Sequence, residues 1–196
     1  MSPEGAEHVL RHLLGEEATE VLRALVSRAL VQRQTTPHGT RLWIPQPLVA
    51  FLRRVDRPRE QAEARDAVDA WCVHLGESKT LHRLRRPEGA GWMVELRTRA
   101  EDLERAVRGG RLDGRQTLNI LRALFGLAVY DTSVCPLDEL VEQLDPDLDF
   151  QPVERAELQY LVLEDALGRK PPPPPERLDN AIATAQAVGH ADLEAS

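Results

Sequence analysis

Two histidines near the N-terminus have a spacing that can bind a metal ion. His8 and His12 are four residues apart, so both would lie on one face of a helix, as paired zinc ligands do. No glutamate follows His8 as in an HExxH motif, and no third ligand stands nearby. We therefore expect a solvated helix face and no metal site. The other histidines are scattered, and we expect surface or partly packed side chains for His38, His74, His82 and His190.

Nucleophiles and phosphate-binding loops form no recognisable catalytic arrangement in the sequence. It contains no GxxxxGK[ST], GxGxxG or GxSxG motif, and Ser27, Ser78 and Ser133 have no base near them in the sequence. Cys72 and Cys135 stand far apart and outside any CxxC spacing, which indicates buried free thiols. We expect a protein that is not an enzyme and that binds no cofactor.

The charge of the chain gives no general attraction to nucleic acid. The formal net charge is −7, and an arginine-rich stretch at 82–87 is the one candidate for a basic patch. Acidic residues are interleaved with the arginines that follow this stretch, namely Glu95, Glu101 and Glu104 among Arg97, Arg99, Arg105 and Arg108. We therefore expect no DNA contact by this stretch.

Hydropathy predicts no association with a membrane. No apolar run approaches the roughly 18 residues that a membrane span needs, and the N-terminus has no signal-peptide pattern. These two observations together predict a cytoplasmic protein.

The N-terminal part of the chain predicts a small domain of helices and one β-hairpin. Proline and glycine bound a helix over 3–14, and apolar residues at helical spacing predict a second helix over 16–33. The segments ALVQRQ and TRLWI, on either side of a turn, predict a β-hairpin. Pro45 ends the second strand and Pro47 begins the next helix. This order is that of a winged-helix domain, at about residues 1–56, with a core that we expect to include Leu22, Leu25, Leu30, Trp43, Leu48 and Phe51.

The rest of the chain predicts helices only. They are expected at 58–77, 91–107, 113–131, from Pro136, at 152–167 and at 176–189, with a polyproline spacer at 171–175 before the last of them. The whole is therefore predicted to be an all-α chain with one small β-hairpin, in which residues 57–196 form a helical array.

Several stretches resemble a family of signalling proteins. LVSRALV, a turn and then RLWIPQPLVAFL resemble the winged-helix segment of bacterial signal-transducing ATPases of the STAND class, which include LuxR-like transcriptional regulators. WMVELRTRAEDLERAVRGG resembles a later helix of the same proteins. ELQYLVLEDALG and RLDNAIATAQAVGHADLEA are similar to degenerate tetratricopeptide helices in their sensor arms. The resemblance implies a winged-helix domain followed by a tetratricopeptide-like array.

Departures from the family pattern concern the nucleotide. Family members that sense nucleotide carry a histidine at the strand-to-helix junction, where this chain has Ile44, Pro45 and Gln46. Proline offers neither a donor nor an imidazole, which implies that nucleotide sensing is lost. The chain also has no ATPase core, so it is either part of a larger regulator or a free-standing module.

Two functions are consistent with these features. The first is a non-catalytic regulatory arm that binds a protein partner, or a second copy of itself, through the helical array. Its expected interaction face is the stripe Ala181, Ile182, Ala185 and Val188. The alternative is a DNA-binding winged-helix transcriptional regulator with a helical dimerisation tail. The predicted helix over 16–33 mixes arginines with glutamates, which is unfavourable for reading base edges.

Overall fold

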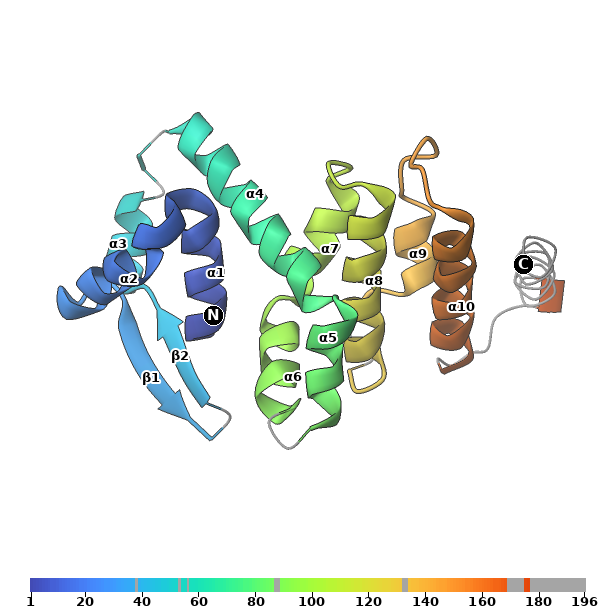
Figure 1. Ribbon diagram of the computed structural model, residues 1–196, viewed down its shortest axis with the longest axis horizontal. Helices are drawn as coiled ribbons and strands as arrows, with labels where there is room; N and C mark the ends of the chain where they lie inside the picture. The colour runs from blue at the N-terminus through green and yellow to red at the C-terminus, as the bar shows by residue number, and fades with distance from the viewer. Residues whose placement is uncertain are drawn as a thin grey trace. The chain divides into compact units, whose positions relative to one another are not determined.

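The computed structural model describes residues 1–37, 39–52, 54–55, 57–86, 89–131, 134–168 and 175–176. Over these residues the chain is mainly helical with one two-stranded antiparallel hairpin, which confirms the predicted fold class (Figure 1). The chain divides into two compact units. Unit 1 comprises Met1–Cys72 and Arg83–Thr98, and unit 2 comprises Val73–His82 and Arg99–Ser196.

Unit 1 contains residues 1–56 and also residues 57–72 and 83–98. Its elements are α1 (Pro3–Leu14), η1 (Gly15–Glu17), α2 (Ala18–Ser27), β1 (Gln32–Thr36), β2 (Gly39–Trp43), α3 (Gln46–Leu52), most of α4 (Pro58–Leu75), most of η2 (His82–Arg85) and α6 (Gly89–Thr98). The α1 helix has the predicted bounds. Ser2 caps it by accepting a hydrogen bond from the Gly5 N–H, and Gly15 follows it with φ +61°.

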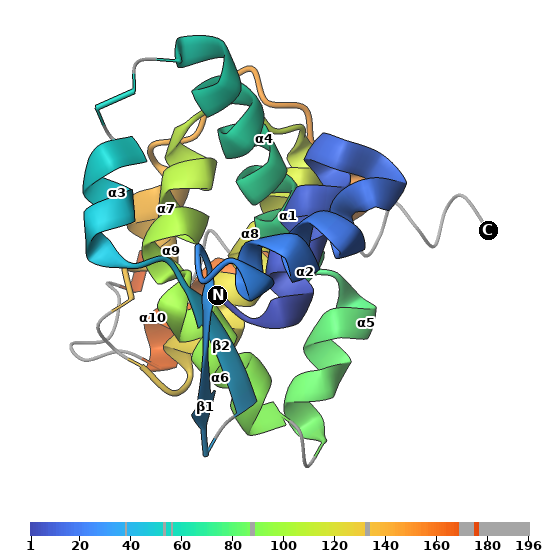
Figure 2. The ribbon, with the colours of Figure 1, turned by 90° about the vertical axis from the view of Figure 1, so that its left-hand side faces the viewer.

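The hairpin joins α2 to α3 in the predicted order, and it extends away from α1, α2 and α3 in both ribbon views (Figures 1 and 2). Gln32 pairs with Trp43 at its open end and Thr36 with Gly39 near the turn. The outer edge of β2 meets the N-terminus, because the Leu42 N–H donates to the Met1 carbonyl at 2.8 Å.

The α2 helix ends six residues earlier than the sequence predicts. Its last residue is Ser27, and Ala29 follows in a left-handed conformation at φ +57°. The Leu30 N–H donates to the Leu25 carbonyl and the Ala29 N–H to the Val26 carbonyl, which is the hydrogen-bond pattern of a Schellman helix end. The left-handed residue of such a turn is usually glycine, so the sequence, which has alanine here, did not predict that the helix ends at this point.

The core of unit 1 is centred on Trp71 of α4, whose side chain is fully buried. The Trp71 ring lies 5.0 Å from the His8 ring and 6.2 Å from the Trp92 ring, measured between centroids. The expected core was wrong at three positions, because Leu30, Trp43 and Phe51 are exposed. The buried apolar residues are instead Ala18, Leu42, Ala67, Trp71, Cys72 and Leu96.

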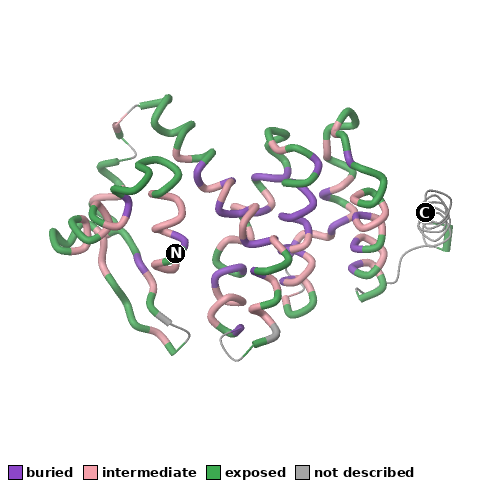
Figure 3. The backbone as a smooth tube through the Cα atoms, in the orientation of Figure 1, coloured by how far each residue is buried: buried purple, intermediate pink, exposed green. Residues whose placement is uncertain are grey.

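Unit 2 is built from helices in the part of the chain that the structure describes. They are the end of α4, α5 (Ser78–Leu81), α7 (Ala100–Arg108), α8 (Gly114–Ala128), α9 (Leu137–Val141) and α10 (Pro152–Gly168). The α8 helix begins at a capping box, in which Asp113 and Gln116 each accept a hydrogen bond from the other's backbone N–H. It is the most buried helix of the unit, and it packs against α5, α7, α9 and α10 (Figure 3).

The single helix expected over 91–107 is two helices, α6 and α7. The chain leaves helical geometry at Arg99, where φ is −105° and ψ is 4°. In the last turn of α6 the Val94 carbonyl accepts hydrogen bonds from the Thr98 hydroxyl and from the Arg41 guanidinium, both of which lie in unit 1. Side-chain hydrogen bonds of this kind compete with the backbone hydrogen bonds of the helix. The apolar residues of the sequence keep their helical spacing across Arg99, so the sequence did not predict the break.

Some predictions fall outside the described residues. They are the helix at 176–189 beyond its first residue, the interaction face of Ala181, Ile182, Ala185 and Val188, and positions 171–174 of the polyproline spacer.

Candidate interaction sites

The strand-to-helix junction at Ile44, Pro45 and Gln46 has a structural role. The Pro45 carbonyl accepts hydrogen bonds from the N–H groups of Leu48 and Val49, so Pro45 is the residue that precedes and caps α3. Pro47 is the second residue of that helix, where a backbone N–H is not needed. Ile44 and Gln46 are exposed beside them. The two prolines thus account for the geometry of the junction without a ligand.

The histidine pair is divided between the core and the surface. His8 packs on Trp71, whereas His12 is exposed on the last turn of α1. The described residues contain no cluster of three or more histidine, cysteine or acidic side chains that could hold a metal ion.

The arginine-rich stretch and its continuation carry ion pairs within each unit. In unit 1, Arg83 pairs with Glu4 at 3.0 Å and lies over the Trp92 ring at 4.8 Å. In unit 2, Asp102 bridges Arg99 and Arg105. Glu4 and Asp102 therefore offset the charges of these arginines. Of the interleaved acidic residues, Glu104 forms an ion pair with Arg108 at 3.2 Å.

The Cys135 thiol lies among charged side chains of unit 2. Its Sγ is 3.4 Å from Arg108 Nη2 and 3.9 Å from Glu139 Oε2. Partial burial is the main cause that raises the pKa of this thiol, and the charges of Glu104 and Glu139 raise it further, against the opposing effect of Arg108. A thiol of this kind is a weak nucleophile at neutral pH.

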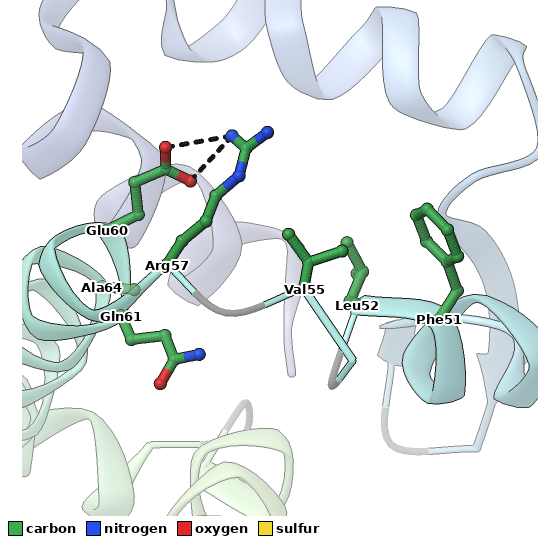
Figure 4. A pocket seen from close by; sticks show the side chains of 7 residues that line it. All are labelled: Phe51, Leu52, Val55, Arg57, Glu60, Gln61 and Ala64. Atoms are coloured by element: carbon green, nitrogen blue, oxygen red, sulfur yellow. Dashed lines mark hydrogen bonds and ion pairs between the residues drawn. The ribbon is translucent and has the colours of Figure 1, made fainter.

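An open hollow of about 390 Å³ lies between the end of α3 and the start of α4 in unit 1 (Figure 4). Phe51, Leu52 and Val55 form its apolar side. Arg57 and Glu60 form an ion pair at 3.0 Å at the other side, and both are exposed. The hollow is therefore lined by apolar surface on one side and by an ion pair on the other.

The α10 helix has two apolar faces. Leu158 and Leu161 are buried on the face that packs in unit 2, together with Asp165, which accepts a hydrogen bond from the Leu137 N–H at 3.0 Å. The opposite face carries a second stripe, here called the α10 seam, at alternating intervals of three and four residues: Val153, Ala156, Tyr160, Leu163 and Leu167. Val153, Tyr160 and Leu167 are 58%, 56% and 49% exposed. This spacing is that of the contact line in a left-handed coiled coil.

Acidic residues are concentrated in the stretch of the chain that contains α9 and α10. Residues 137–168 contain ten acidic side chains and one basic side chain, Arg155, which gives a formal charge of −9. The remainder of the chain carries +2, so this acidic segment accounts for the whole negative charge of the protein. Its exposed members are Glu139, Glu142, Asp145, Asp147, Asp149 and Glu164.

One edge of the α10 seam is lined by glutamates. Glu157 and Glu164 are seven residues apart and follow the seam on the same side. Glu157 accepts two hydrogen bonds from the Arg122 guanidinium on α8, which fixes its position. Glu164 is exposed. Glu164 therefore gives this border an exposed negative charge, whereas the charge of Glu157 is already paired with Arg122.

Neither the α10 seam nor the acidic segment was among the expected sites, although both can be read from the sequence. The 3–4 spacing from Val153 to Leu167 and the formal charge of residues 137–168 need no structure. The structure shows which of the two apolar faces of α10 is buried, and the other face, the α10 seam, is the exposed one.

No family model, curated protein or solved structure matches this chain. In the described part of the chain, no helix combines the length and the apolar content of a bilayer span.

Proposed function

We propose that this protein is a non-catalytic interaction module, the regulatory arm of a STAND-type signalling protein, which binds a protein partner through the helices of unit 2. The observation that supports the proposal is the α10 seam. A helix at the surface normally has one apolar face, which packs inward, and one polar face. On α10 the outward face is apolar as well, over four turns.

A packed helix gains nothing from an apolar outer face unless another molecule covers it. Exposed apolar surface that is continuous along a helix commonly marks a binding site. Amphipathic helices bind such faces through anchors at three- and four-residue intervals. The α10 seam has this geometry, and its central residue is a tyrosine, one of the side chains enriched in binding hot spots.

A selection experiment tests the proposal. A displayed library of helical peptides is selected against the full chain and then rescreened against Tyr160→Glu, which places a charge in the seam. We expect the selected peptides to lose binding to Tyr160→Glu and to retain binding to Tyr130→Glu, a control at another exposed tyrosine. Peptides that bind both variants equally would show that the α10 seam is not the interaction site.

The alternative function, DNA binding through α2 and the hairpin, has weaker support. The exposed side chains of α2 include Glu20, Arg23 and Ser27, and the Ser27 hydroxyl already donates to the Ala24 carbonyl of its own helix. Few polar groups are thus left to face a base edge. We expect no retardation of random duplex DNA at low salt. A retarded complex that weakens with added salt would support the alternative.

A further inference from the structure

We infer that the partner of the α10 seam is a basic amphipathic helix, one with apolar residues at heptad spacing bordered by lysines or arginines. This inference rests on the proposed function and specifies the chemistry of the partner. It follows from two independent observations, the spacing of the seam and the sign of the charge around it.

The spacing selects a helix as the occupant. The α10 seam covers two heptads, from Val153 to Leu167, and extends about 21 Å along the helix axis at about 1.5 Å per residue. Knobs at three- and four-residue intervals fit between the side chains of another helix that crosses at a shallow angle. An extended peptide, whose side chains alternate every two residues, has no matching period.

The charge selects a basic helix. Glu164 is exposed at a border position that pairs with a partner's flanking residue in a coiled coil, and Glu157 occupies the preceding border position in its ion pair with Arg122. The stretch 137–168, which contains α10, carries a formal charge of −9. Positive side chains on the partner would meet complementary potential, which speeds association and favours this partner over a neutral helix. A free anionic lipid surface or a nucleic acid would be repelled by the same charges.

A second copy of this chain is disfavoured by the same border. Two α10 helices in antiparallel register bring Glu157 of one copy beside Glu164 of the other, on both sides of the symmetry axis. They would also bring together two segments of formal charge −9. Like charges facing each other at such positions destabilise the pair.

Matched synthetic peptides test the inference on the full chain. One peptide has leucines at heptad spacing and lysines at the border positions, and its control has glutamates at those positions. Fluorescence anisotropy measures binding at about 50 mM and about 300 mM NaCl, where the Debye length falls from about 14 Å to about 6 Å. Both peptides are used at concentrations at which circular dichroism and sedimentation show a monomer.

The expected result has three parts. The lysine peptide binds more tightly than the glutamate peptide, and its advantage shrinks at the higher salt. Glu164→Lys reduces that advantage by about tenfold, whereas Glu20→Lys on α2, which changes the net charge equally, does not. Tyr160→Glu lowers the affinity for the lysine peptide by about tenfold or more, and Tyr130→Glu does not. Thermal melts of all variants verify that each is folded.

Three results would overturn the inference and separate it from the proposed function. Equal binding of both peptides, with loss in Tyr160→Glu, would leave the α10 seam as a helix-binding site without charge selectivity. Absence of peptide binding together with a dimer that Tyr160→Glu dissociates would assign the seam to a second copy. Absence of binding by a chain that is monomeric with and without Tyr160→Glu would overturn both the inference and the proposed function.

Discussion

At the scale of single residues, Gly76 has the least room for a side chain among the glycines that the structure describes. It follows α4, and a Cβ built on it would lie 1.5 Å from the backbone carbonyl oxygen of Asn119 in α8. A backbone group in a buried helix cannot move aside as a flexible side chain can. The close approach of these two segments of unit 2 therefore depends on the absence of a side chain at Gly76.

We expect Gly76→Ala to lower the free energy of unfolding by roughly 2 to 4 kcal/mol, the range of severe overpacking. Urea denaturation followed by circular dichroism measures the loss. Gly168→Ala is the matched control, because a Cβ at that position meets nothing within 4 Å. Equal stability of the two variants would mean that α8 and the end of α4 are less closely packed than described.

The two thiols should differ in reactivity. Cys72 is fully buried, and the pKa of Cys135 is raised, mainly by burial and further by Glu104 and Glu139. At pH 7.5 the native protein should therefore modify slowly at one thiol with an aromatic disulfide reagent and at the second only after denaturation. Because the raised pKa keeps the thiol protonated, the rate at Cys135 should still be rising at pH values where an ordinary cysteine has reached its plateau.

A charge variant tests the cause of this shift. Glu139→Gln removes a negative charge beside the sulfur, which lowers the pKa of Cys135 and should speed its modification at pH 7.5. A rate that stays unchanged would show that Glu139 does not contribute to the raised pKa of Cys135.

At the scale of elements, the end of α2 is the clearest departure from ordinary sequence rules. Ala29 adopts φ +57°, a conformation that costs an L-residue about 1 kcal/mol more than it costs glycine. Ala29 is exposed, so its methyl group has little packing to lose. We expect Ala29→Gly to stabilise the protein by up to about 1 kcal/mol, measured as a higher urea midpoint. A lower midpoint would indicate that the conformation of this turn differs from the one described.

How well the sequence predicts each element depends on where its boundary signal lies. Residues at the helix ends predict the bounds of α1 and the start of α8. For α1 they are the Ser2 cap, Pro3 and Gly15, and for α8 the residue is Asp113. The end of α2 at an alanine and the break at Arg99 have no such residues. The exposure of Trp43 and Phe51 also could not be predicted, because it depends on Trp71 and other distant residues filling the core.

The two candidate sites differ in the same way. The apolar intervals of the α10 seam and the charge of the acidic segment are properties of one contiguous stretch, so the sequence contains them in full. The hollow between α3 and α4 needs the relative placement of two helices, which no local pattern gives.

At the scale of the whole molecule, unfolding should be a single transition. The chain passes between the two units three times, once within α4, so neither unit is one continuous stretch. All three tryptophans, Trp43, Trp71 and Trp92, lie in unit 1, and their fluorescence reports on that unit alone. Circular dichroism at far-ultraviolet wavelengths reports on the helices of both.

We expect Leu124→Ala in the core of unit 2 to lower the urea midpoint measured by tryptophan fluorescence and the one measured by circular dichroism by the same amount. The free energy of unfolding should fall by roughly 2 to 5 kcal/mol, as for other buried leucines. The common shift would follow from the shared helix α4, which both units need in order to fold. A tryptophan transition that remained in place while the circular dichroism transition moved would show that unit 1 folds independently of unit 2.

The threading of the chain through both units also bears on how such a protein can change during evolution. Unit 2 needs residues 73–82, which lie between the two stretches of unit 1. A recombination event with one breakpoint between 98 and 99 would transfer unit 1 whole but leave unit 2 without that segment, and a breakpoint at 72 would divide unit 1. Exchange of either unit with another gene therefore requires several coordinated breakpoints, and the two units are expected to be inherited together.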